Sequence, residues 1–316
     1  MSVPRPMLAS TGELPIAAGW AYELKWDGVR AMTVVGKTGM RLYARSGADV
    51  TKAYPELARL GPALAEAGVT DAILDGEIVV LDEAGHPSFM ALAERIHVRD
   101  AHRTQQLAAS LPVNYMIFDV LRANGTDVCP VPYAERREWL ESLAERIGGG
   151  GRWVLPPVFP DGEATLAVAR AESMEGVVAK RLSSAYRPGL RSPDWVKVKC
   201  EQTGHYLVGG WRTGRRELSA LLVGDLGPDG ALRYRGRVGG GISAAAERTL
   251  LARLAALRRA DSPFAEPIPR EDARDATYTA PVLEVEVRYG NMTPDGKLRF
   301  PRFVRLLTDG SAGGHA

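Results

Sequence analysis

The chain has 316 residues, of which 45% are hydrophobic and 25% are charged, and this composition excludes a disordered or fibrous protein. A formal net charge of +2 permits a nucleic-acid partner without requiring one. No apolar run approaches the ~18 residues of a membrane span, so we expect a cytoplasmic protein that does not bind membranes. Two cysteines, Cys129 and Cys200, are too few for a disulfide framework, and because they are not in a Cys-x-x-Cys spacing and the five histidines are scattered, we expect no zinc site.

The first segment that suggests chemistry is YELKWDGVR, residues 22–30. Leu24 and Trp26 can wall the amine of Lys25, and Gly28 lets the chain bend after it. A lysine is nucleophilic only when neutral, and deprotonation from an ordinary pKa of ~10.4 to pH 7.5 costs ~4 kcal/mol. A catalytic Lys25 would therefore need burial, cations or a metal nearby. Taken alone, the tetrapeptide is more often an exposed lysine before a turn.

Acidic residues interrupt two apolar segments further along the chain. In DAILDGEIVV, residues 71–80, the strand period of two places Asp75 and Glu77 on one face, where an apolar residue would normally pack. Glu175 in MEGVVAK is similar, because it stands beside a glycine and leads into an apolar strand. Hard oxygen ligands of this kind suit Mg²⁺, although an acid that faces water at a strand edge is the commoner case.

Aromatic and basic residues follow in the next predicted strands. Phe118 in MIFDVL is either a core residue or a platform for a stacked base. In WVKVK, Lys197 and Lys199 share one strand face, so they repel each other unless an anion such as a phosphate lies between them. By the same period Lys180 lies on the face opposite Glu175, and we leave it out of the predicted site. Arg30 and Arg45 add two further anion-binding groups.

Helical patterns separate these strands. Residues 131–147 place Leu140, Leu143 and Ile147 on one stripe, and residues 243–259 form a second predicted helix with Ser243 as its N-cap and two arginines in its last turn. Residues 1–200 mix strands and helices without regular alternation, which predicts an α+β domain with antiparallel sheets. Residues 201–316 are short strands and turns around one helix, which predicts a small antiparallel barrel.

Read in order, ELKWDGVR, ARSG, LDGEIVV, MIFDVL, MEGVVAK, WVKVK and RFPRFVRL resemble the nucleotidyltransferase motifs of ATP-dependent DNA ligases. The likeness covers nearly the whole chain and is greatest to the compact bacterial ligase C and ligase D type catalytic cores. It implies a nucleotidyltransferase (adenylation) domain over residues 1–200 and an all-β OB-fold barrel over residues 201–316. It also implies that the protein seals nicks in duplex DNA, in DNA repair, through a lysyl-AMP and an adenylated 5′-phosphate.

The resemblance also assigns roles around the nucleotide. Lys25 would attack the α-phosphate of ATP and carry AMP as a phosphoramidate. Glu23 would lie by the adenine, Phe118 would stack on it, and Arg30 would reach the ribose. Arg45 would contact the nucleotide or the 5′-phosphate of the nick.

The remaining roles concern the sugar, the metal and the phosphates. Glu77 and Glu175 would serve the ribose and Mg²⁺ or Mn²⁺, and Lys197 and Lys199 would hold the α-phosphate. Arg302, on the mobile OB domain, would orient the pyrophosphate. Nucleotidyl transfer needs in-line positioning and charge neutralisation more than acid–base groups, which agrees with such a set.

Two alternatives remain open at this stage. An RNA ligase or an mRNA-capping guanylyltransferase shares the Lys-x-Asp-Gly nucleophile and several later motifs. A non-enzymatic OB-fold nucleic-acid-binding protein is the alternative from another class, although it would have no use for buried acids beside a lysine. For the ligase we expect a monomer in the cytoplasm, associated with the nucleoid, that meets repair proteins in trans.

Overall fold

The computed structural model describes residues 3–148, 151–293 and 295–307, and the chain divides into two compact units, Met1–Cys200 and Glu201–Ala316. Each unit has its own buried apolar clusters. No helix in the described part of the chain is long and apolar enough to cross a membrane.

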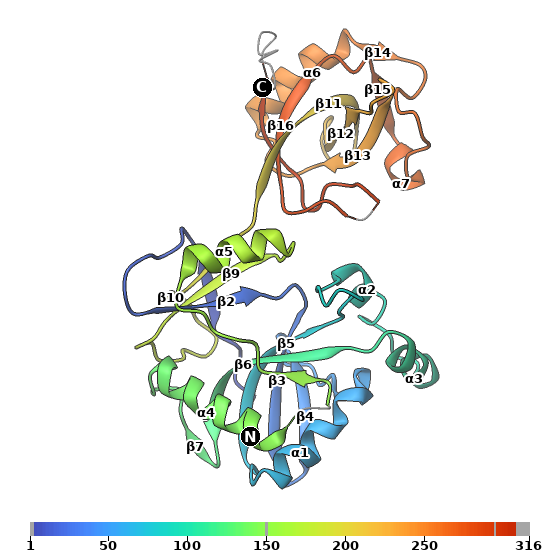
Figure 1. Ribbon diagram of the computed structural model, residues 1–316. Helices are drawn as coiled ribbons and strands as arrows, with labels where there is room; N and C mark the ends of the chain where they lie inside the picture. Colours follow the sequence, from blue (N-terminus) through green and yellow to red (C-terminus); the bar gives the residue numbers. More distant parts are fainter. Residues whose placement is uncertain (1–2, 149–150, 294, 308–316) are drawn as a thin grey trace. The chain divides into compact units, whose positions relative to one another are not determined.

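Two sheets and the helices that cover them make up the first unit (Figure 1). The first sheet has the order β1 (Leu8–Thr11), β10 (Arg191–Lys199), β9 (Gly176–Arg181), β2 (Trp20–Lys25). The second has the order β4 (Gly39–Ala44), β3 (Val29–Gly36), β5 (Ala72–Val79), β6 (Asn114–Ala123), β7 (Thr126–Asp127), with β8 (Trp153–Val154) paired to β6. Strand pairing is antiparallel except for β1 with β10 and β6 with β8. The predicted α+β class is therefore confirmed, with two short parallel pairs added to it.

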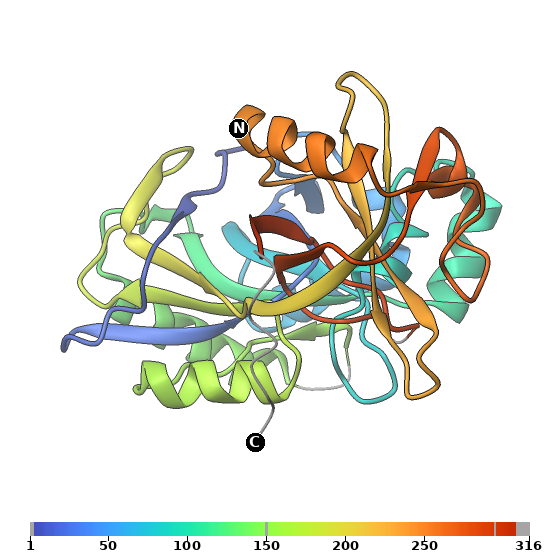
Figure 2. The ribbon, with the colours of Figure 1, turned by 90° about the horizontal axis from the view of Figure 1, so that it is seen from above.

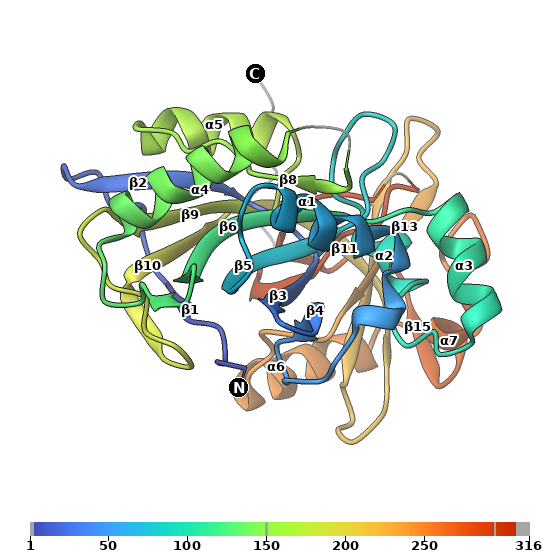
Figure 3. The ribbon, with the colours of Figure 1, turned by 90° about the horizontal axis from the view of Figure 1, so that it is seen from below.

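The helices of the first unit pack on the faces of these sheets. They are η1 (Thr51–Ala53), η2 (Pro55–Arg59), α1 (Leu60–Glu66), α2 (Phe89–Ala93), α3 (Ala101–Ser110), α4 (Tyr133–Ile147) and α5 (Gly162–Ala171). Figure 3 shows α5 beside β2 and β9, and α4 packs on β6. Leu140 and Leu143 of α4 are buried, as their spacing predicts, against the core that β3, β5 and β6 share.

The second unit is mainly β. Its sheet has the order β13 (Leu232–Val238), β12 (Ala220–Leu226), β11 (Gln202–Arg212), β15 (Ala276–Thr279), β14 (Arg258–Arg259), with β16 (Glu284–Tyr289) paired to β11 and β17 (Arg302–Leu306) paired to β16. The long strand β11 is strongly curved in Figure 2, and a register shift between Val208 and Gly210 lies within it. Backbone pairing does not close the barrel among the described residues.

Helix α6 (Ala244–Ala255) lies where the sequence predicts the one helix of this domain, and the short helix α7 (Arg270–Ala273) is an addition to the predicted β-barrel fold. Ser243 caps α6 as predicted, since its Oγ accepts a hydrogen bond from the backbone N–H of Ala246 at 3.2 Å. The predicted end of this helix is wrong. Arg258 and Arg259 form β14, paired with Thr279 and Tyr278, because they gain a strand partner that the local sequence does not reveal.

Candidate active site

Register brings the predicted basic residues together on one face of the first sheet. Lys25 of β2 and Lys199 of β10 both lie opposite Gly176 of β9, and Glu23 and Lys197 both lie opposite Val178. Directly opposite residues of neighbouring strands share a face, so the side chains of all four project to the same side of the sheet.

This face forms one wall of a cavity of about 520 Å³ in the first unit. The second sheet supplies the facing side chains, and Leu8 and Ala9 of β1 complete the lining. The predicted site residues that line the cavity are Glu23, Lys25, Arg30, Arg45, Glu77, Phe118 and Lys197. Leu24 and Trp26 also line it, as expected for residues that wall the amine of Lys25.

Glu175 connects Lys25 and Lys199, although neither Glu175 nor Lys199 lines the cavity. One carboxylate oxygen contacts Lys25 Nζ, and the other lies 2.9 Å from Lys199 Nζ. Burial raises the pKa of Glu175, but the two lysines outweigh it, and the net pKa lies below its ordinary value. Glu175 is therefore a carboxylate at neutral pH.

Lys180 lines the cavity, and its exclusion from the predicted site is wrong. It lies opposite Ala21 and Trp195, on the same face as Lys197. Glu175 precedes β9, and Gly176 at the start of the strand has φ +151°. The alternation of side chains along β9 therefore does not extend back to Glu175, and counting from Glu175 assigns Lys180 to the wrong face.

The Lys180 ammonium is almost fully buried within a cage of polar and aromatic groups. Its Nζ lies 2.6 Å from Glu23 Oε1 and donates to the Phe118 carbonyl at 3.0 Å. The ring centroids of Trp195, Phe118 and Tyr133 are 4.4, 4.6 and 4.8 Å away. Tyr133 Oη also donates to Glu23. Burial lowers the pKa of Lys180, and Glu23 opposes that shift.

Glu77 and Arg30 face each other across β5 and β3, where they form a directly opposite pair. Burial raises the pKa of Glu77 to about 7, against the opposing charges of Arg30 and Lys25. The guanidinium of Arg30 binds Asp75, because its Nε and Nη2 donate to the two carboxylate oxygens at 2.5 and 2.6 Å. Asp75 has no exposed surface, and this bidentate pair satisfies the acid that the strand pattern left without a partner.

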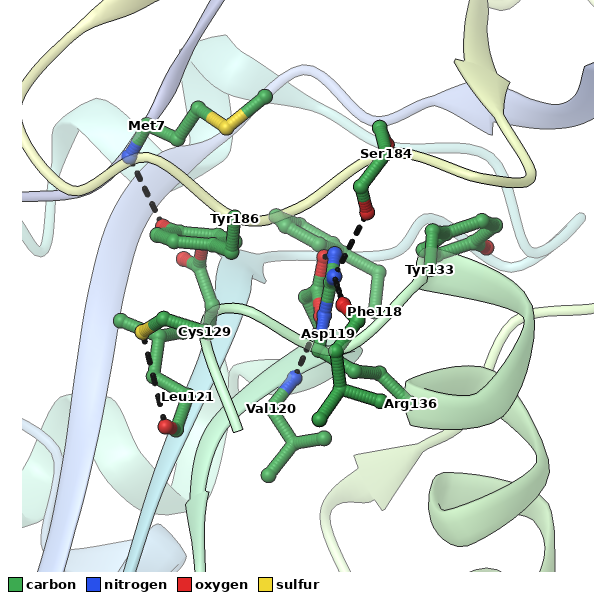
Figure 4. A network of polar contacts seen from close by, with 12 residues as sticks. Met7, Phe118, Asp119, Val120, Leu121, Cys129, Tyr133, Arg136, Ser184 and Tyr186 are labelled. Carbon is green, nitrogen blue, oxygen red and sulfur yellow. Dashed lines mark hydrogen bonds and ion pairs between the residues drawn. The ribbon is translucent and has the colours of Figure 1, made fainter. Parts of the chain in front are cut away.

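A buried polar network includes Met7, Tyr186, Asp119 and Arg136 (Figure 4). Tyr186 Oη donates to Asp75 at 2.5 Å and accepts from the backbone N–H of Met7 at 2.8 Å. Beside it, Arg136 donates to both oxygens of Asp119 at 2.7 and 2.9 Å. The sequence contains no signal for Tyr186, since it contacts residues more than a hundred positions away.

Phe118 is both a core residue and part of the cavity lining. It is 8% exposed and packs with Met7 and Trp195, and the Arg30 guanidinium lies 4.6 Å from its ring centroid. The register between β5 and β6 shifts at this position, so Phe118 is the extra residue of a bulge. Trp195, which the sequence reading missed, precedes Lys197 by two and shares its face by the same period.

The oxygen donors of the site fit a magnesium ion only in part. Among the described residues, no group of three or more His, Cys, Asp or Glu is arranged to hold a metal. Mg²⁺ usually takes only one or two protein carboxylates and completes its shell with water and substrate phosphates. Glu77 and Glu175 are two carboxylates of the kind that such a site uses, but in this structure both oxygens of Glu175 contact lysines, and the described residues form no all-protein cage for a metal.

Comparisons with known proteins identify the family. The ATP dependent DNA ligase domain matches residues 6–199, and the ATP dependent DNA ligase C terminal region matches residues 214–310. The multifunctional non-homologous end joining DNA repair protein LigD of Mycobacterium tuberculosis is 40% identical over 311 residues, which cover 96% of this chain and 38% of that protein. DNA ligase C1 of Mycolicibacterium smegmatis is 33% identical over 321 residues, which cover 96% of this chain and 88% of that protein.

A solved structure supports the same assignment. The ligase domain from M. tuberculosis LigD has 38% sequence identity and a TM-score of 0.57, over 97% of this chain and 96% of that chain. The chain spans about two fifths of the length of the full LigD relatives that it matches. These matches and the residues of the cavity confirm the resemblance drawn from the sequence motifs: the chain belongs to the ATP-dependent DNA ligase family.

Proposed function

We propose that the chain seals nicks in duplex DNA with ATP as the AMP donor. One observation carries the proposal: Lys25 ends β2 at a cavity whose walls gather Lys180, Lys197, Glu77 and Glu23. In the first step Lys25 Nζ bonds to the α-phosphorus of ATP, and the bond to pyrophosphate breaks. AMP then passes to the 5′-phosphate of the nick. Finally the 3′-hydroxyl attacks that phosphate and AMP leaves.

Glu23 and Lys180 are suited to recognise the adenine. Their side chains are 2.6 Å apart and place a hydrogen-bond acceptor next to a donor in the cavity. Adenine offers the complementary pair, an amino donor beside a ring-nitrogen acceptor, whereas guanine carries an acceptor oxygen in place of the amino group. Phe118 and Trp195 supply the apolar surface against which a base can pack.

Lys197 and Lys199 would hold the α-phosphate beside Lys25. Burial and then the charges of Lys25 and Lys199 lower the pKa of Lys197, so a bound anion would relieve this repulsion. Lys25 cannot attack while its ammonium is held by Glu175. We infer that, before transfer, the contact with Glu175 breaks and the ammonium of Lys25 loses a proton to solvent, while Lys199 retains the carboxylate.

Glu77 and Glu175 would hold the divalent ion together with substrate phosphates. Mg²⁺ or Mn²⁺ supplies charge neutralisation on the phosphates when it is bound. In this assignment Glu77 also accepts from the ribose hydroxyls, and Arg30 is kept next to the sugar by Asp75. Arg45 is exposed at the rim and would contact the 5′-phosphate of the nick. Arg302 is exposed on β17 of the second unit, and its role toward pyrophosphate stays a prediction.

The names of the relatives favour a place in DNA repair. We infer that the nicks arise in end joining, because several LigD relatives are named for that process. A monomer that works in the cytoplasm at the nucleoid, with repair proteins as partners in trans, stays part of this proposal.

Sealing assays test the proposal directly. A duplex with one nick, labelled at its 5′-phosphate, is incubated with the protein, a divalent metal and ATP, GTP or NAD in parallel. The proposal predicts sealing with ATP and a DNA nick. Preference for GTP would favour a capping-type guanylyltransferase, preference for an RNA nick would favour an RNA ligase, and binding without sealing would favour a non-enzymatic OB-fold protein.

A further inference from the structure

A second cavity of about 860 Å³ opens beside the nucleotide cavity in the first unit. The two share Val29, Arg30, Ala44 and Ser46 in their linings. The second cavity is walled by β3 and β4, by the segment over residues 48–54 and by the loop and helix start over residues 95–104. The second cavity therefore extends from the edge of the nucleotide cavity, where Arg45 lies, to a part of the surface beyond the residues assigned to the nucleotide.

Most charges that line the second cavity are already paired. Arg30 is bound to Asp75, and Arg41 donates to Asp49 at 3.0 Å. The side chain of Arg95 is 1% exposed and donates to Glu56 at 2.7 Å. In each of these three pairs the positive and the negative charge neutralise each other, and the pair is part of the folded structure.

Two cations of the lining remain uncommitted. Lys52 of η1 and Arg99 of the α2–α3 loop are exposed, and neither takes part in an ion pair with another described residue. Asp49 is the one acid of the described lining, and its hydrogen bonds with Thr51 and Arg41 keep its pKa below the ordinary value. The cavity thus has a local excess of positive charge, and Arg45 at the shared rim adds to it.

An anion that is extended and carries several charges fits this arrangement better than a small one. Lys52 and Arg99 come from segments separated by more than forty residues, and both reach the same cavity. Exposed, flexible cations without buried partners hold phosphates without reading bases. We propose that the second cavity holds the phosphodiester backbone of the nicked strand next to Arg45, with Lys52 and Arg99 as its phosphate contacts. This inference rests on the proposed nick-sealing function.

The test compares two variants of the full chain that each lose two exposed cations. Lys52→Ala/Arg99→Ala removes the proposed contacts. Lys37→Ala/Arg170→Ala removes one lysine and one arginine that are exposed elsewhere on the first unit and do not line either cavity. Three quantities are measured: the ATP dependence of lysyl-AMP formation, binding to a nicked duplex between 50 and 200 mM salt, and single-turnover sealing of a nick that is already adenylated.

The proposal predicts that lysyl-AMP formation stays within twofold of wild type in both variants. For Lys52→Ala/Arg99→Ala, the slope of log affinity against log salt should be less steep by about 2, because each phosphate contact contributes ~0.9. Raising the salt from 50 to 200 mM should then cost this variant about tenfold less affinity than it costs wild type. Sealing at subsaturating enzyme should fall by about tenfold at low salt, while the control variant keeps its sealing rate.

Two results would overturn the assignment. A salt slope equal to that of the control variant would mean that no phosphate is held there. A raised ATP requirement for lysyl-AMP formation, with DNA binding unchanged, would place the triphosphate of ATP in the second cavity instead. Failure of the wild-type chain to form lysyl-AMP at all would instead count against the proposed function, whereas normal adenylation with an unchanged slope would overturn only this inference.

Discussion

Removing the hydroxyl of Tyr186 tests whether the buried network aims Arg30 at the nucleotide. The hydroxyl donates to the buried Asp75 carboxylate at 2.5 Å and accepts from Met7 N–H at 2.8 Å. A hydrogen bond to a charged group contributes ~1.5–3 kcal/mol, and a buried N–H left without a partner costs ~1–3 kcal/mol. Tyr186→Phe keeps the edge-on ring contact with Trp195, so we expect a loss of about 3 kcal/mol.

Tyr115→Phe is the matched control. Tyr115 is fully buried in the same unit, but its hydroxyl donates to a neutral carbonyl, that of Ala31, at 2.9 Å. Its loss should cost about 1 kcal/mol. For a domain of this size 1 kcal/mol shifts the midpoint of thermal unfolding by ~2–4 °C, so the first unit should melt roughly 6–12 °C lower in Tyr186→Phe and about 2–4 °C lower in Tyr115→Phe.

Activity provides a second measurement for the same pair. If Asp75 holds Arg30 in place for the nucleotide, Tyr186→Phe should raise the KM for ATP in lysyl-AMP formation by about fivefold, or ~1 kcal/mol, and Tyr115→Phe should leave it unchanged. Equal melting points and equal KM values in the two variants would refute the reasoning. The hydroxyl would then contribute no more than an ordinary neutral hydrogen bond.

Two further predictions concern single groups of the cavity. With its pKa at about 7, Glu77 is mostly protonated at pH 6 and mostly ionised at pH 8, so the affinity of the AMP-free chain for adenosine, which cannot react with Lys25, should fall about tenfold as the pH drops from 8 to 6. Glu77→Gln should remove that pH dependence, and a fall of equal size in Glu77→Gln would exclude the carboxylate as its source. Lys180→Met leaves the Glu23 carboxylate buried without its cation and should destabilise the protein by about 3–5 kcal/mol. Glu23→Gln added to Lys180→Met should recover part of that loss in chemical denaturation, and additive losses would show that the two groups do not interact.

Local patterns predict much of this site because strand periodicity is a short-range property. Asp75 and Glu77 share a face in the structure, as do Lys197 and Lys199, and in each case the spacing of two residues was sufficient. The same spacing of two residues relates Trp195 to Lys197, so the sequence alone could have predicted that Trp195 lies on the same face.

The failures come from information that lies outside a local segment. Lys180 lines the cavity because its partners across the sheet, Ala21 and Trp195, fix its face, and these partners cannot be read from one strand whose alternation does not extend back to Glu175. Tyr133 and Tyr186 reach Glu23 and Asp75 across more than a hundred residues of chain. Arg258 and Arg259 leave the predicted helix because β15 offers them a partner.

The central claim is that Lys25 carries AMP, and the most direct measurement is the position of the label after incubation with α-labelled ATP and Mg²⁺. The protein is digested, and the labelled peptide is identified by mass. We predict one adenylated peptide that contains Lys25, with a bond that is labile in acid and stable in base, as a phosphoramidate should be. The Lys25→Ala variant should take up no label. Label on Lys180 or Lys197, or label that persists in Lys25→Ala, would contradict the account.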